Sequence, residues 1–407
     1  MIGLLNRARW LLSGNILFAF SQWTMLIFFS RMSNHEQLGY YSYALAVTAP
    51  IFLLSNLQLR PLFIADFNTE NLFNFSQYFS LRLITVVLAC FLSLFFIRWD
   101  GQLVISIFIL VIAIKALEAI SDIIYAFYNA KKQTYFISKS LSFKSVLVII
   151  LSFLTLYLTN NIFYSLLATL LAYMFILTSI DLKQNTDLLK DINFLDSNFK
   201  EIFFTGLPLG ISVMLISLQT NIPRYFLESH INIDSVGIYT ILYYFLVIGG
   251  IIINSICQYL SPYFSEFYKK NQLEKLKKSI FQASIIALLL GVSGLIVSML
   301  SHSFIIKAIY GDSFIQYSYL LPYIMFAGIF SYLSIVAGYL LTSLRLFKVQ
   351  VPIFFILVLL TTLYSYVLIP RFGLLGAVYT TILTAVSQLM ISSSVVIIKI
   401  KDLNKNV

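Results

Sequence analysis

The sequence is poor in charged residues and in cysteine. Of its 407 residues, 11% are charged and 59% are hydrophobic, which excludes a soluble globular protein. Cys90 and Cys257 are the only cysteines, and both lie in apolar runs, so neither a disulfide framework nor a zinc site is expected. The chain also lacks a phosphate-binding Gly-Lys-Ser/Thr loop, which argues against an ATP-driven pump.

Other features typical of an enzyme are missing as well. The three histidines (His35, His230 and His302) fall at predicted external ends of apolar runs, in a spacing that does not suggest a metal site. The loops between the runs are too short for a soluble catalytic domain. We therefore expect no catalytic residues, no metal and no cofactor. The first apolar run lacks a small-residue cleavage site, so we expect it to remain as a membrane helix.

Long apolar segments dominate what is present, and each is long enough to cross a bilayer. They predict an all-α polytopic membrane protein with about twelve transmembrane helices. The expected spans are 10–30, 38–62, 81–98, 103–127, 141–159, 162–180, 203–226, 236–259, 280–300, 315–342, 350–368 and 374–398.

The distribution of basic residues predicts the orientation. With the N-terminus inside, 21 of the 27 Lys and Arg residues fall on the cytoplasmic side, among them Arg60, Arg82 and Lys144. Five fall outside, including Arg224, and Lys115 lies within the membrane. This asymmetry follows the positive-inside rule and places both termini in the cytoplasm. The net charge of +10 then reflects cytoplasmic loops and not nucleic-acid binding.

The chain reads as two six-helix halves, residues 1–180 and 203–407, joined by a cytoplasmic linker over 181–202. A second long cytoplasmic loop is expected over 263–279, where an amphipathic helix on the membrane surface is one interpretation. With a shift of 198 residues, Gly39 matches Gly237 and Tyr41 matches Tyr239, each in the second span of its half. Such a parallel repeat predicts a substrate site between the halves.

Three charged residues lie inside the fourth span. The spacing of Lys115, Glu118 and Asp122 puts them on one helical face. Each charge near the bilayer centre costs roughly 2.5–3.5 kcal/mol, so this face should look into protein or into a wet cavity. Mutual neutralisation that holds helices together is the simpler alternative, and it stays open.

Polar and proline residues recur in the second and seventh spans. Pro50 and Pro208 are candidate hinges, although ordinary membrane-helix kinks would look the same. Gln219 and Asn221 could face a cavity or form interhelical hydrogen bonds. Cavity roles are likewise open for Arg60 and Arg224, which lie near span ends and could instead extend their charged groups to lipid headgroups.

These residues together resemble a known family. The segment from Leu38 to Arg60, the set Lys115, Glu118, Ser121, Asp122 and Tyr125, and the segment 217–228 with its Asn221-Ile222-Pro223-Arg224-Tyr225 element resemble helices two, four and seven of Wzx-type polysaccharide repeat-unit flippases. These belong to the multidrug/oligosaccharidyl-lipid/polysaccharide exporter superfamily. The resemblance covers nearly the whole chain. It departs at Ala126 and Asn129, where the family pattern has glycine and glutamine.

The resemblance implies a flippase in the bacterial cytoplasmic (inner) membrane. Such proteins move undecaprenyl-pyrophosphate-linked oligosaccharide units to the outer leaflet by alternating access, for O-antigen or capsule biosynthesis. Arg60, Lys115 and Arg224, with Gln219 and Asn221, are then the candidate cavity residues for the anionic cargo. Glu118 and Asp122 are the candidates for coupling to H+ or Na+. A polymerase and a chain-length regulator are candidate partners, besides membrane lipids.

Two other functions are compatible with the same helices. A multidrug antiporter of this superfamily would favour acidic and aromatic cavity groups because its cargo is cationic. A polysaccharide polymerase or lipid-dependent glycosyltransferase should show a large external loop with acidic or arginine clusters, and the sequence predicts none.

Overall fold

The computed structural model describes residues 2–68, 73–98, 101–183, 198–270, 272–344 and 346–405. By contact the chain divides into two compact units, Met1–Ser217 and Leu218–Val407, and the division falls inside a long helix, α8 (Phe199–His230). The first unit also contains α1 (Ile2–Met32), α2 (His35–Ser55), α3 (Leu59–Asn68), α4 (Phe75–Leu94), α5 (Gln102–Ala130), α6 (Thr134–Thr159), α7 (Ile162–Ile176) and the π-helical turn η1 (Leu177–Asp181). The second unit contains α9 (Ile233–Lys269), α10 (Leu273–Tyr310), the 3-10 segment η3 (Asp312–Leu320), α11 (Leu321–Ser343), α12 (Phe347–Phe372) and α13 (Leu374–Lys405).

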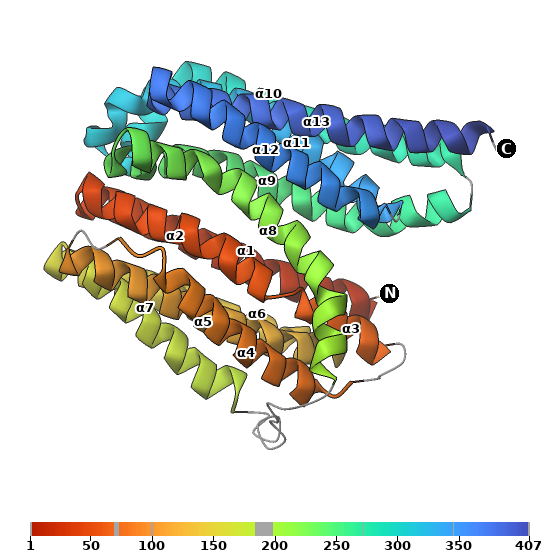
Figure 1. Ribbon diagram of the computed structural model, residues 1–407, viewed down its shortest axis with the longest axis horizontal. Coiled ribbons are helices and arrows are strands. Elements are labelled where there is room, and N and C mark those ends of the chain that lie inside the picture. The colour runs from red at the N-terminus through yellow and green to blue at the C-terminus, as the bar shows by residue number, and fades with distance from the viewer. Residues whose placement is uncertain are drawn as a thin grey trace. The chain divides into compact units, whose positions relative to one another are not determined.

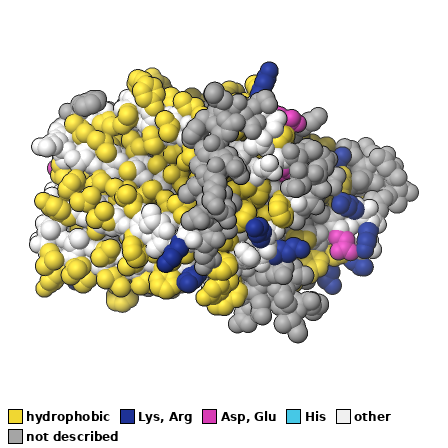
Figure 2. Space-filling view, turned by 90° about the horizontal axis from the view of Figure 1, so that it is seen from below, with side chains coloured by type: hydrophobic (Ala, Val, Ile, Leu, Met, Phe, Trp, Pro, Cys, Tyr) yellow, Lys and Arg dark blue, Asp and Glu magenta, His cyan; other side chains and the backbone are white. Residues whose placement is uncertain are grey.

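The predicted all-α polytopic membrane fold is confirmed. Over the described ranges, eleven helical segments are long and apolar enough to cross a bilayer, with α2 and α3 forming one of them. These eleven correspond to the second to twelfth expected spans, and the 31-residue α1 overlaps the first. The exposed side chains suit a lipid environment. Val87 and Phe91 of α4 and its C-cap residue Phe95, for example, follow one another at steps of four and are 66%, 58% and 70% exposed. Figure 2 shows hydrophobic side chains over one part of the displayed face and Lys and Arg over another.

The loop predicted over 263–279 is wrong in its secondary structure, whereas its cytoplasmic placement stays a prediction. Helix α9 continues through Pro262 to Lys269, and α10 begins at Leu273, so most of segment 263–279 forms the ends of two long helices. The polar and charged residues of this segment predict a loop from the sequence, but most of them lie in the last turns of α9 and the first turns of α10. Most of the predicted linker, residues 184–197, lies outside the described residues, and the boundaries of the two halves stay a prediction.

The second expected span is interrupted. Helix α2 runs through Pro50 without stopping and ends at Ser55, and α3 begins at Leu59. Between them, Leu57 and Gln58 have φ angles of 47° and 51°, a left-handed backbone that side chains other than glycine rarely adopt. This break redirects the chain and brings α3 against α5.

Helix α5 organises the first unit. It packs against α2, α3, α4 and α7 (Figure 1). A core of buried aromatic and aliphatic side chains, including Phe63, Phe79 and Ile123, joins α3, α4 and α5 at one end. The polar face of α5 is thereby held in a fixed orientation among these helices.

Candidate functional site

The first unit contains a cavity of about 350 Å³. Its walls come from α1, α2, α3, α5 and α6, together with the residue that follows α2. It is lined by Asn15, Phe18, Ala49, Phe52, Leu53, Asn56, Arg60, Lys115, Glu118, Ala119, Ser121, Asp122, Tyr125, Leu141 and Lys144. The charged face predicted for the fourth span therefore looks into a hollow that is lined by both polar and apolar side chains. Three of the lining residues are cations and two are carboxylates.

One ion pair of this cavity is local to α5. Lys115 Nζ lies 2.7 Å from Glu118 Oε2, as their three-residue spacing allows. The other carboxylate oxygen of Glu118 accepts a hydrogen bond from the Tyr173 hydroxyl of α7 at 3.2 Å. Tyr173 in turn accepts one from Gln22 of α1 at 3.0 Å. The mutual neutralisation considered from the sequence thus exists for this pair.

The other carboxylate of the face, Asp122, pairs with arginines from two other helices. Its Oδ1 lies 3.1 Å from Arg60 Nη1 on α3, and its Oδ2 lies 3.4 Å from Arg82 Nη2 on α4. Arg82 also donates to the Asn56 side chain at the helix break. The Arg82 side chain is 0% exposed, whereas Arg60 and Asp122 are 26% and 33% exposed. Asp122 therefore bridges a reachable cation and a buried one.

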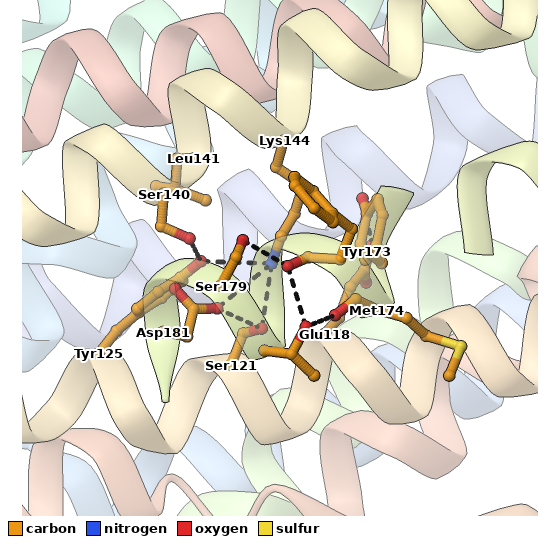
Figure 3. Close-up of polar contacts among 12 residues, drawn as sticks. Glu118, Ser121, Tyr125, Ser140, Leu141, Lys144, Tyr173, Met174, Ser179 and Asp181 are labelled. Carbon is orange, nitrogen blue, oxygen red and sulfur yellow. Dashed lines mark hydrogen bonds and ion pairs between the residues drawn. The ribbon is translucent and has the colours of Figure 1, made fainter. Parts of the chain in front are cut away.

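A second ion pair lies deeper, where α5, α6 and η1 meet. Lys144 Nζ donates to Ser121 Oγ at 3.0 Å and to the Tyr125 hydroxyl at 3.3 Å, and it lies 3.8 Å from Asp181 Oδ2 (Figure 3). Ser121 donates to the same Asp181 oxygen at 3.1 Å. The side chains of Lys144 and Asp181 are only 2% and 1% exposed. The network pairs two charges that burial alone would make costly, while Asp181 Oδ1 is buried without a hydrogen-bond donor among the described residues.

Sequence reasoning missed Arg82, Lys144 and Asp181 as internal residues. We had placed the two cations at cytoplasmic span ends and Asp181 in the linker. The helices start earlier or end later than expected: α4 begins at Phe75, α6 at Thr134, and the π-helical turn after α7 extends to Asp181. A capping signal could have revealed the start of α4, because Asn74 and Gln77 form a reciprocal capping box.

The burial of these cations changes the charge count. Arg82, Lys144 and Arg224 are all buried. Without them, the predicted counts of basic residues on the inside and the outside change from 21 and 5 to 19 and 4. The asymmetry that predicts cytoplasmic termini persists.

The remaining predicted site residues belong to the second unit. Arg224 of α8 is 7% exposed and donates to Thr240 Oγ1 at 2.9 Å, to the Thr220 carbonyl at 3.0 Å and to Asn221 Oδ1 at 3.0 Å. Its guanidinium also lies over the rings of Tyr239 and Tyr243, at 5.3 and 5.0 Å from their centroids. The headgroup-contact interpretation is therefore wrong for Arg224.

Gln219 lines a hollow whose walls include Tyr239 and Tyr243, the two rings that Arg224 contacts. Its Nε2 donates to Gln388 Oε1 at 3.0 Å, and the two line a small hollow of about 60 Å³ with threonine and tyrosine side chains. The structure thus brings Arg60, Lys115, Glu118 and Asp122 together in one cavity of the first unit, and Gln219, Asn221 and Arg224 belong to the second unit.

The chemistry available in the cavity of the first unit is that of charged and polar side chains. Among the described residues, no group of three His, Cys, Asp or Glu side chains gathers in a way that could hold a metal ion. Guanidinium and ammonium groups bind phosphate and carboxylate oxygens through charge-assisted hydrogen bonds. Because the cavity presents both cations and carboxylates, it can exchange internal ion pairs for pairs with an anion from outside.

The sequence is similar to a known protein family and to a curated protein of that kind. The model of a family described as "Polysaccharide biosynthesis protein" matches residues 4–268. The capsular polysaccharide biosynthesis protein CapF of Staphylococcus aureus is 28% identical over 370 residues, which cover 90% of this chain and 92% of CapF.

Solved structures with the same fold belong to transporters of the MOP superfamily, the exporter superfamily named above. A multidrug resistance MATE family transporter in an inward-facing conformation aligns with a TM-score of 0.77 at 13% identity, covering 98% of this chain and 99% of the transporter. A MOP superfamily transporter from Pyrococcus furiosus, described as having a binding pocket of reverse polarity, aligns with a TM-score of 0.69 at 14% identity, covering 99% of this chain and 96% of the other. At these identities the likeness concerns the fold.

Proposed function

Because the chain belongs to the polysaccharide biosynthesis protein family, we propose that it is a flippase for undecaprenyl-pyrophosphate-linked oligosaccharide repeat units. It moves these units from the cytoplasmic to the outer leaflet of the bacterial inner membrane by alternating access. The units then serve the synthesis of a surface polysaccharide of the capsule or O-antigen type. A polymerase and a chain-length regulator act on the units afterwards.

The observation that carries this proposal is the cationic cavity of the first unit. Arg60, Lys115 and Lys144 line it, against the two carboxylates Glu118 and Asp122. A cargo that carries a pyrophosphate, and often acidic sugars, is attracted to such a site. The lining has one cation more than it has carboxylates, which favours an anionic cargo over a cationic drug and therefore the flippase over the multidrug antiporter.

The energy source in this proposal is an ion gradient. Glu118 and Asp122 are the candidate groups for H+ or Na+, because both are carboxylates on the cavity wall. Neutral Glu118→Gln and Asp122→Asn proteins should lose the dependence of transport on the ion gradient. Normal ion dependence in both variants would exclude these residues from coupling.

The function is tested in a strain that lacks this protein. Lipid-linked oligosaccharides are extracted, the leaflet that holds them is determined, and surface polysaccharide is assayed. We expect surface polymer to disappear and lipid-linked units to accumulate facing the cytoplasm. Complete but unpolymerised units on the outer face would indicate a polymerase, and unchanged surface glycan with new sensitivity to cationic drugs would indicate an antiporter.

Complementation then assigns the cavity residues. Arg60→Gln and Lys115→Gln should restore surface polymer at least about tenfold less well than the wild type, in line with the loss of one strong charge-assisted contact. Lys277→Gln is the matched control, because Lys277 is an exposed cation of α10 paired with Glu274, and it should complement fully.

A further inference from the structure

The Asp122 carboxylate pairs with the Arg60 guanidinium, the group that an anionic cargo would have to contact. We propose that Asp122 is an internal competitor for Arg60, which a phosphate oxygen of the cargo displaces while Arg82 keeps hold of the aspartate. This inference rests on the proposed function, because it concerns an anion in the same cavity. It assigns unlike roles to the two arginines, Arg60 as a contact for the cargo and Arg82 as a positioning residue.

The exposure of the three side chains supports this division. Arg60 and Asp122 are partly exposed and line the cavity, so a ligand can reach the Arg60 guanidinium from inside it. Arg82 is fully buried and does not line the cavity. It is also held by Asn56, at the break between α2 and α3. A ligand therefore meets Arg60 first, with Asp122 as the group to be replaced.

The two bonds of Asp122 make the exchange inexpensive. Breaking a buried ion pair is strongly unfavourable when it leaves one charge without a partner. Here the aspartate that gives up Arg60 at 3.1 Å still has Arg82 at 3.4 Å, so its charge stays compensated. Arg60 meanwhile exchanges a carboxylate for a phosphate, two anions that guanidinium binds in the same way. The net affinity stays modest, which allows the cargo to leave on the other side.

The neighbouring pair of the cavity is built differently and provides a control. Glu118 pairs with Lys115 of its own helix, and its second hydrogen bond comes from the neutral hydroxyl of Tyr173. Neutralising Glu118 removes the same charge from the same cavity as neutralising Asp122. Only Asp122, however, competes for Arg60.

A double-mutant cycle tests the competition, with inorganic pyrophosphate as the probe and the full-length protein in nanodiscs. Calorimetric titration gives the Kd of wild type, Asp122→Asn, Arg60→Gln and the double variant, and the same cycle is repeated with Glu118→Gln. We expect Asp122→Asn to lower the Kd about tenfold when Arg60 is present and less than about twofold in the Arg60→Gln background. Glu118→Gln should change the Kd by the same factor in both backgrounds.

Equal effects of Asp122→Asn in both backgrounds would overturn the inference, since the aspartate would then act only through its general field. A raised Kd would overturn it as well. In either case, if Arg60→Gln still weakens pyrophosphate binding, the anion site of the proposed function remains supported although the competition by Asp122 is excluded. If the wild type binds no pyrophosphate, the inference falls with its premise, and the leaflet assay decides the function separately.

The folding of the variants is checked by size-exclusion chromatography. If Asp122→Asn does not fold, Asp122→Ser replaces it in the same cycle, because serine is small and uncharged and Arg82 keeps its hydrogen bond to Asn56. The same expected and overturning results apply to it.

Discussion

At the scale of single residues, the first unit encloses several charged side chains and pairs them with side chains of opposite charge. Lys144 and Asp181 form an almost completely buried pair, and Ser121 shares hydrogen bonds with both of them. Tyr173 adds its ring face, with its centroid 4.9 Å from Lys144 Nζ. Such a network stabilises the fold only while it is complete.

We expect Lys144→Met to destabilise the protein by about 3 kcal/mol, because the Asp181 carboxylate would remain buried without its cation. The double variant Lys144→Met/Asp181→Asn should lose clearly less, since it removes both charges. Thermal unfolding in detergent measures the difference. The exposed pair gives the control: Lys277→Met should shift stability by no more than about 0.5 kcal/mol. Equal losses in the single and double variants would show that the two charges are not coupled.

The site could be predicted from the sequence only where partners are close along the chain. The spacing of Lys115 and Glu118 predicted their shared helical face, and they form an ion pair. The partners of Asp122 lie 62 and 40 residues away, on α3 and α4. They meet it only because these helices pack on α5, and no local pattern contains that information.

At the scale of helices, the break between α2 and α3 is the feature that the sequence hid. Apolar residues continue through Leu57 and Leu59, so hydropathy predicts one span. Neither Leu57 nor Gln58 is a residue type that favours a left-handed backbone. Tertiary contacts support the break: Gly206 and Gly210 of α8 bring that helix close to the Leu57 and Leu54 carbonyls. Two glycines four residues apart were visible in the sequence, but their partner was not.

Gly206→Ala tests this close approach. An added Cβ would lie 2.6 Å from the Leu57 carbonyl oxygen, which is part of the backbone and cannot easily move aside. We expect a loss of about 1–3 kcal/mol, the usual cost of overpacking, seen as a lower melting temperature in detergent. At Gly338 an added Cβ would meet nothing within 4 Å, so Gly338→Ala should cause no loss. Equal stability of the two variants would contradict tight packing of α8 on the break.

At the scale of the whole molecule, composition and hydropathy were sufficient for the fold class. All twelve expected spans correspond to helices. Unpaired backbone N–H and C=O groups are costly in lipid, and an apolar segment avoids this cost by forming a helix, in which these groups pair with one another. Span ends were harder to predict. Charged residues such as Arg82 and Lys144 predict span ends from the sequence, but internal partners allow these charges to lie well inside the helices.

Orientation in the membrane is predicted from the basic residues alone, and two engineered cysteines can test it. Ile231 and Gln272 lie just beyond the two ends of α9, so a spanning α9 must place them on opposite sides. In a Cys90→Ala/Cys257→Ala background, Ile231→Cys should react with a membrane-impermeant maleimide in cells stripped of their wall. Gln272→Cys, next to a lysine-rich segment, should react only after the membrane is opened. The reverse pattern would place the termini outside, and labelling of both cysteines from outside would contradict a membrane-spanning α9.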